Sequence, residues 1–126
     1  MYFLVKAPPA TPRDVYTFNE KTMYRGRQIS PKDEIFIFAS DHMGGQGLVA
    51  KGVVTSVALG EGSRVTIKVR RTALSRRPLG RSDLKPFCDL DDDQPQTEIA
   101  RKFYRQATNK IGGISEQAAR FLNTYF

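Results

Sequence analysis

The sequence is short of cysteine and histidine, with one of each among its 126 residues. Cys88 therefore cannot form a disulfide within the chain, and one cysteine with one histidine cannot make the usual zinc sites. No apolar run approaches the roughly 20 residues of a transmembrane helix. The N-terminus has neither the basic start nor the apolar stretch of a signal peptide. These absences predict a cytoplasmic protein that needs no metal or cofactor and has no membrane partner.

Motifs for catalysis are also missing. Ser40, Asp41 and His42 are consecutive, and because consecutive side chains point apart they are not expected to form a catalytic triad. No Gly-x-Ser-x-Gly elbow is present. The glycine loop at residues 44–47 lacks the Lys-Ser/Thr pair of a nucleotide-binding loop. The sequence therefore favours a protein that is not an enzyme.

The length predicts one domain, residues 1–126. Its strongest strand signal is Ile35–Phe38, a run of β-branched and aromatic residues that is typical of a strand covered on both faces. Residues 64–71 alternate strictly between apolar and polar, which predicts a strand with a basic outer face. Two further strands are expected at residues 2–6 and 48–58.

Helices are expected at three places. Thr11-Pro12 resembles a helix start before residues 15–18, and residues 19–28 are interpreted as an ordered loop. Thr97 and Ser115 are predicted to cap two C-terminal helices.

Gly52, inside a predicted strand, indicates a bulge of the kind that curls a small sheet into a barrel. The pattern predicts an α+β fold, a small β barrel with peripheral helices.

Positive charge is unevenly distributed. The net charge is +7, and residues 64–85 hold eight basic residues and one acidic residue. Such segregation favours a polyanionic partner, because lysine and arginine near phosphates release counterions. An aromatic residue between basic ones, at Tyr24, also suits base stacking. The candidate nucleic-acid-binding residues are Lys21, Tyr24, Arg25, Arg27, Lys68, Arg70, Arg71, Arg76, Arg77 and Arg81. The alternative is a solvated surface, or one paired with the acidic residues at 89–93.

Four stretches of the sequence resemble EVE domains. Residues 2–9 (YFLVKAPP) are similar to the family's opening Tyr-Trp-Leu-x-Lys-x-x-Pro strand, with Phe3 in place of the tryptophan. Residues 30–40 are similar to its turn and aromatic-rich strand, with Lys32 where the turn glycine is expected. Residues 48–54 resemble the next strand, and residues 104–116 resemble the closing Arg-Gln element, short strand and capped helix.

The resemblance implies a PUA-like, EVE-like β pseudo-barrel that recognises RNA or a modified, flipped-out base in DNA. The implied base pocket contains Phe3, Phe38, Ser40, His42 and Arg105. The family's Trp-x-x-Val-Arg-Asn pocket stretch has no counterpart between residues 19 and 28.

Two other functions remain open. Residues 19–25 partly resemble the motif of the related ASCH domains, which implies a ribonuclease or small amidohydrolase that uses Lys21, Tyr24 and Arg25. The motif's glutamate is replaced by Tyr24. A small-ligand or protein-interaction domain is the second alternative.

Overall fold

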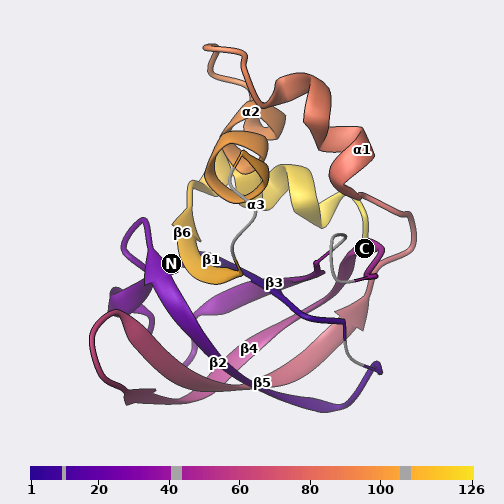
Figure 1. The fold of residues 1–126 in the computed structure, drawn as a ribbon. Coiled ribbons are helices and arrows are strands. Elements are labelled where there is room, and N and C mark those ends of the chain that lie inside the picture. The colour runs from indigo at the N-terminus through magenta and orange to yellow at the C-terminus, as the bar shows by residue number, and fades with distance from the viewer. Residues whose placement is uncertain (10, 41–43, 106–108) are drawn as a thin grey trace.

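The computed structural model describes residues 1–9, 11–40, 44–105 and 109–126. Its six strands close into a barrel in the order β1-β3-β4-β5-β2-β6 (Figure 1). The strands are β1 (Tyr2–Ala7), β2 (Val15–Met23), β3 (Glu34–Ala39), β4 (Gly47–Leu59), β5 (Arg64–Leu74) and β6 (Lys110–Ile114). The helices are α1 (Arg81–Leu84), α2 (Pro95–Ile99) and α3 (Glu116–Asn123), with 3₁₀ turns η1 (Gly26–Gln28) and η3 (Lys85–Phe87) and the π-helical turn η4 (Ala100–Tyr104). The predicted α+β barrel with peripheral helices is confirmed.

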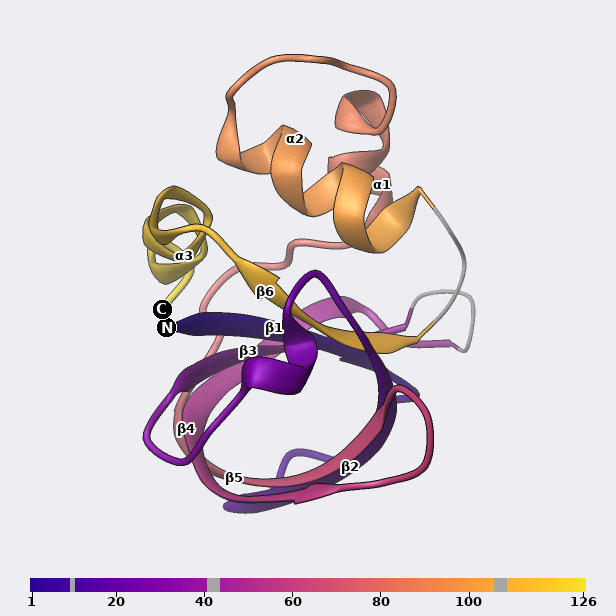
Figure 2. The same ribbon diagram turned by 90° about the vertical axis from the view of Figure 1, so that its left-hand side faces the viewer.

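The wall formed by β1 and β3 separates two hydrophobic cores. β1 pairs in parallel with β3 and antiparallel with β6. Ile35 and Ile37 of β3 point into the barrel, while Phe36 and Phe38 point outward into a second core beneath the helices. Figure 2 shows the helices gathered on the β1 and β6 side of the barrel. Ile35–Phe38 is therefore covered on both faces, as its sequence predicts.

The long hairpin of β4 and β5 forms much of the remaining barrel. Gly52 lies at a register shift between these strands, and a Cβ there would lie 2.4 Å from the carbonyl oxygen of Arg70. The predicted bulge at Gly52 is thus confirmed, and only glycine fits this close approach. The side chains of Val65, Ile67 and Val69 are fully buried inside the barrel, as the alternation in β5 predicts.

The predicted helix after Thr11-Pro12 is wrong, and so is the loop predicted for the first part of residues 19–28. Residues 15–23 form strand β2, which pairs antiparallel with β5. Tyr16 and Phe18 are buried in the barrel, whereas their neighbours along the strand are exposed. This is a period of two rather than a helical period. Pairing with β5 outweighs a local signal for a helix start, because it buries both aromatic rings.

The two predicted helix caps have different outcomes. Thr97 does not cap α2, which begins at Pro95 after Gln94, and the Thr97 hydroxyl instead donates to Asp92 at 2.5 Å. Ser115 does cap α3, because its Oγ accepts a hydrogen bond from the backbone N–H of Ala118 at 3.1 Å. Proline at the first helical position explains the earlier start of α2. Within the described ranges, no helix is long and apolar enough to cross a membrane.

Candidate functional site

A strained turn follows β2 at Tyr24 and Arg25. Both residues have left-handed backbone conformations, with φ of 49° and 67°. Non-glycine residues adopt this region at a cost, and such turns persist where the surrounding structure holds them. Here the carbonyl oxygen of Tyr24 accepts a hydrogen bond from the N–H of Gly113 in β6 at 2.8 Å. The turn presents the Tyr24 side chain, 41% exposed, at the surface.

Aromatic and cationic groups surround the Tyr24 ring. The ring of Phe103, from η4, lies 6.2 Å away between centroids and is fully buried. The ammonium groups of Lys102 and Lys110 lie 5.3 and 5.5 Å from the Tyr24 ring centroid. Both distances are within the range of cation–π attraction. These contacts fix the ring at the junction of the barrel and the helices.

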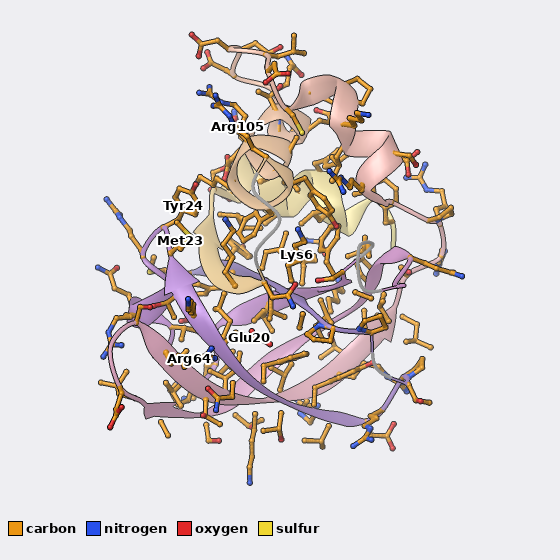
Figure 3. The ribbon with its side chains drawn as sticks, in the orientation of Figure 1. Lys6, Glu20, Met23, Tyr24, Arg64 and Arg105 are labelled. Carbon is orange, nitrogen blue, oxygen red and sulfur yellow. The ribbon has the colours of Figure 1, made fainter. Side chains whose placement is uncertain are left out.

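A groove beside this ring opens between the turn and the helical segment α2–η4. It has a volume of about 530 Å³ and is lined by Tyr24, Glu98, Arg101, Lys102 and Arg105. A neighbouring hollow of about 410 Å³ shares Tyr24 and Lys102 and adds Arg25. Figure 3 shows Tyr24 and Arg105 on the same side of the molecule, with Arg64 and Glu20 lower on the barrel. Tyr24 and Lys102 therefore stand between two adjoining depressions.

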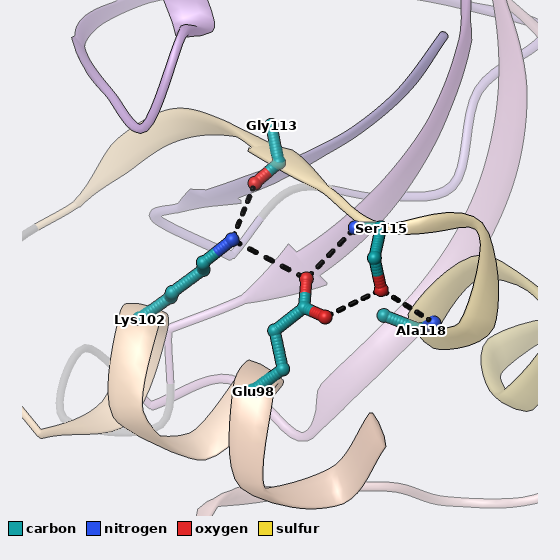
Figure 4. A network of polar contacts seen from close by, with 5 residues as sticks. All are labelled: Glu98, Lys102, Gly113, Ser115 and Ala118. Carbon is teal, nitrogen blue, oxygen red and sulfur yellow. Dashed lines mark hydrogen bonds and ion pairs between the residues drawn. The ribbon is translucent and has the colours of Figure 1, made fainter. Parts of the chain in front are cut away.

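Glu98 organises one wall of the groove (Figure 4). Its carboxylate accepts from the ammonium of Lys102 at 3.3 Å and from the N–H of Ser115 at 2.8 Å. The Ser115 hydroxyl donates to the same carboxylate. Lys102 also donates to the carbonyl oxygen of Gly113 at 3.5 Å. This network joins α2 and η4 to β6 and α3, and it holds the Lys102 ammonium beside Tyr24.

The groove and its neighbouring hollow are predominantly cationic. Their linings include Arg25, Arg101, Lys102 and Arg105 against the single carboxylate Glu98. Arg101 makes an exposed ion pair with Asp91 of 3.2 Å. Exposed pairs of this kind are weak, so a polyanion can replace that partner. The surface is suited to phosphate groups.

Two buried lysines lie behind the groove, opposite each other on β1 and β6. Lys6 is 2% exposed and donates to the carbonyl oxygen of Phe103 at 2.9 Å. Lys110 is 1% exposed, and its ammonium has no hydrogen-bond partner in the described part of the chain. Burial lowers the pKa of the Lys110 ammonium, because desolvation disfavours its charged form.

The structure does not bring the predicted base-pocket residues together. Phe3 and Phe38 are fully buried in different cores, on opposite sides of the barrel wall. Ser40 is buried and donates to Asn109. His42 lies outside the described residues. Arg105 is exposed and lines the groove, so of these five only Arg105 joins Tyr24 there.

The predicted basic residues divide among several surfaces. Lys68 and Arg70 are exposed on the outer face of β5, and Arg71 pairs with Asp14 at 3.2 Å. Arg77 stacks on the Tyr125 ring at 4.3 Å and donates to the carbonyl oxygen of Thr124. The remaining members of the set are also exposed and do not line the groove: Lys21 on β2, Arg27 on η1, Arg76 after β5 and Arg81 on α1.

Sequence reasoning missed Glu98, Arg101, Lys102 and Lys110. Glu98 and Lys102 are four residues apart, as are Arg101 and Arg105, so each pair shares one helical face. That spacing was a usable signal. Nothing near Lys110 in the sequence indicates its burial, which depends on η4 and the Tyr24 turn packing over β6. Among the described residues, no three His, Cys, Asp or Glu side chains gather in a way that could hold a metal ion.

The closed mixed barrel, with parallel β1–β3 and β2–β6 pairs and helices over one side, has the architecture that the resemblance to EVE domains predicts. No protein-family model and no curated protein matches the chain. Solved structures do match it. The DUF55 domain of human thymocyte nuclear protein 1 has a TM-score of 0.71 at 10% identity, over 98% of this chain and 97% of that domain. The resemblance to EVE domains is thus confirmed at the level of the fold.

Two further solved structures share the architecture. A structure of the human THYN1 protein in complex with DNA containing 5-methylcytosine has a TM-score of 0.69 at 11% identity, covering 98% of this chain and 95% of that one. Protein PSPTO5229 from Pseudomonas syringae has a TM-score of 0.67 at 12% identity, with both chains fully covered. At such low identity the similarity describes the fold, and the function has to be argued from this chain's own residues.

Proposed function

We propose that this chain is a non-catalytic nucleic-acid-binding domain that accepts a flipped-out base at the groove beside Tyr24. The observation that carries the proposal is the half-exposed Tyr24 ring in a depression lined by three cationic side chains, those of Arg101, Lys102 and Arg105. An aromatic ring offers a stacking surface for any base, and exposed arginines offer charge and paired donors to phosphates. The ring of Tyr24 would bind the base, and the arginines would bind the phosphates.

The modified base in DNA is the first ligand to test, and RNA is the second. A THYN1 protein with this fold has been crystallised with 5-methylcytosine-containing DNA, which supports a ligand of the same chemical class here. A base extruded from a duplex has two apolar faces and a polar edge, and it needs a stacking partner outside the helix. Arg101 and Arg105 line the groove and are exposed, so they can contact the phosphates on either side of such a base.

Fluorescence anisotropy with labelled oligonucleotides tests the proposal. The probes are one duplex with a single 5-methylcytosine, the same duplex unmodified, and a single-stranded RNA of equal length. We expect binding that weakens steeply between 50 and 200 mM salt, because phosphate contacts release counterions. The rank of the three probes decides between modified DNA and RNA as the preferred ligand.

A matched pair of variants locates the binding surface. Arg105→Gln removes one charge from the groove, and Arg70→Gln removes one charge from the outer face of β5. We expect only Arg105→Gln to weaken binding. Absence of binding to every probe at 50 mM salt, or equal loss in both variants, would contradict the proposal.

The enzyme alternative has less support from the geometry. It requires Lys21, Tyr24 and Arg25 to act on one substrate, but Lys21 is exposed on the outer face of β2 and lines neither depression. The cytoplasmic location remains a prediction from the sequence.

A further inference from the structure

The two buried lysines behind the groove differ in the hydrogen bonding of their ammonium groups. Lys6 and Lys110 face each other across the β1–β6 pair, and both are almost completely buried. Lys6 donates to the carbonyl oxygen of Phe103 and lies 4.6 Å from the Tyr104 ring centroid. The Lys110 ammonium lies 5.5 Å from the ring centroid of Tyr24 and 5.8 Å from that of Phe103, and it has no hydrogen-bond acceptor among the described residues.

A buried ammonium without an acceptor is costly, and such groups are rare in folded proteins. Two aromatic faces compensate for lost water only in part. Burial also lowers the pKa of this group, in agreement with an environment that supplies no counter-charge. An apolar side chain at position 110 would pack in the same place without this cost. The unmet hydrogen-bonding capacity therefore points to an acceptor that arrives with a ligand.

We infer that Lys110 is the specificity-determining donor of the groove, whose ammonium hydrogen-bonds a keto oxygen or ring nitrogen on the edge of the base that enters beside Tyr24. This inference rests on the proposed function. The ammonium is covered by Tyr24, which sits on the left-handed turn at residues 24–25. For the base to reach Lys110, the Tyr24 side chain must move from the position that its contacts with Phe103, Lys102 and Lys110 favour.

The position of Lys110 favours a base edge over a phosphate. Lys110 is 1% exposed, and its ammonium faces the rings of Tyr24 and Phe103, whose centroids lie 6.2 Å apart. Arg101 and Arg105 are exposed and line the groove. Phosphates stay hydrated and are best bound by exposed arginines, whereas a flat base can stack on an aromatic ring and turn its polar edge toward a buried donor. A site that hydrogen-bonds one polar edge rejects a ligand that lacks it, because its own buried group is then left unpaired. Lys110 would thus contribute selectivity, and the arginines general affinity.

The test uses Lys110→Met, which keeps the length and apolar packing of the side chain. Two duplex probes are compared: one with a single 5-methylcytosine and one with a stable abasic site at the same position. We expect the wild-type protein to prefer the base-containing probe by tenfold or more. Lys110→Met should bind both probes equally, at the affinity of the wild-type protein for the abasic one. Arg105→Gln should weaken binding to both probes by the same factor and keep the preference.

Thermal stability separates a binding role from a structural one. Because the Lys110 ammonium has no acceptor within residues 1–9, 11–40, 44–105 and 109–126, Lys110→Met should raise Tm. Lys6→Met should lower Tm by removing the hydrogen bond to Phe103. A lower Tm for Lys110→Met, or an unchanged preference for the base-containing probe, would overturn the inference while leaving nucleic-acid binding intact. A wild-type protein that binds neither probe would refute the proposed function, and the inference with it.

Discussion

Two surfaces of this molecule carry clustered positive charge: the groove beside Tyr24 and the outer face of β5 with Lys68 and Arg70. On β5 the side chains beneath the charges are Val65, Ile67 and Val69, which fill the barrel. The groove instead has an exposed aromatic ring, a depression of about 530 Å³ and, behind it, a lysine with no hydrogen-bond partner in the described part of the chain. Strand alternation produces the first surface, because every second side chain must face solvent. The groove needs three separate segments to meet, which alternation does not produce.

The largest expected effect is on the free energy of unfolding, when the buried side chain beneath each of the two surfaces is truncated. Phe103→Ala empties the space beneath Tyr24 and should cost about 3–5 kcal/mol of unfolding free energy, whereas Ile67→Ala beneath the β5 face should cost about 2–5 kcal/mol. Both side chains are fully buried. Chemical denaturation measures the two losses. At denaturant concentrations well below the unfolding midpoints of both variants, only Phe103→Ala should bind DNA more weakly than the wild-type protein. Equal affinities of the two variants for DNA would show that the groove is not the binding surface.

The next effect concerns the aromatic ring itself. Tyr24→Leu keeps apolar bulk but removes the stacking surface, and we expect a loss of about 1–3 kcal/mol in binding free energy. Tyr125→Leu is the matched control, because it removes a tyrosine that stacks with Arg77 away from the groove. Anisotropy titrations at one salt concentration give both values. A similar loss in the two variants would mean that Tyr24 has no special role.

A smaller effect is expected on the salt dependence of the affinity for DNA. If Arg105 contacts one phosphate, Arg105→Gln should reduce the slope of log affinity against log salt by about 0.9. Arg70→Gln on the β5 face should leave the slope unchanged. Titrations at four salt concentrations between 50 and 200 mM measure the slopes. A reduced slope for Arg70→Gln would extend the binding surface onto the barrel.

The smallest effect is expected at Glu20, which lies on β2 near Arg64 and away from the groove (Figure 3). Partial burial raises the pKa of its carboxyl, and the nearby Arg64 opposes this shift. The folded state therefore favours the protonated form. The resulting stabilisation is fully present below the unfolded pKa, near 4.5, and is lost as pH rises through the folded value.

Glu20→Gln should accordingly be slightly more stable than the wild-type protein at pH 7. The difference should shrink as the pH falls and disappear below the unfolded pKa near 4.5, with DNA affinity unchanged throughout. Urea denaturation at several pH values measures this difference. A constant difference at all pH values would assign the effect to packing and not to ionisation.

The barrel was more predictable from the sequence than the groove. Ile35–Phe38, the alternation in β5, the bulge at Gly52 and the cap at Ser115 are local patterns, and the structure contains all four. The helix predicted after Thr11 was wrong because its aromatic residues also fit a strand, and only pairing with β5 decides between the two. The groove could not be predicted as a unit, because Tyr24, Lys102 and Lys110 meet only after the chain has folded.

The pairing of β6 also has a consequence for how the chain is made. β6 hydrogen-bonds to both β1 and β2, so the barrel cannot close until residues 110–114 have left the ribosome. Synthesis proceeds at about 5–20 residues per second. Between the synthesis of β2 and that of β6, β1 and β2 each have an edge without its native neighbour. The β1 and β2 edges that pair with β6 therefore stay open until the C-terminal segment is free to fold, and the groove is among the last features to form.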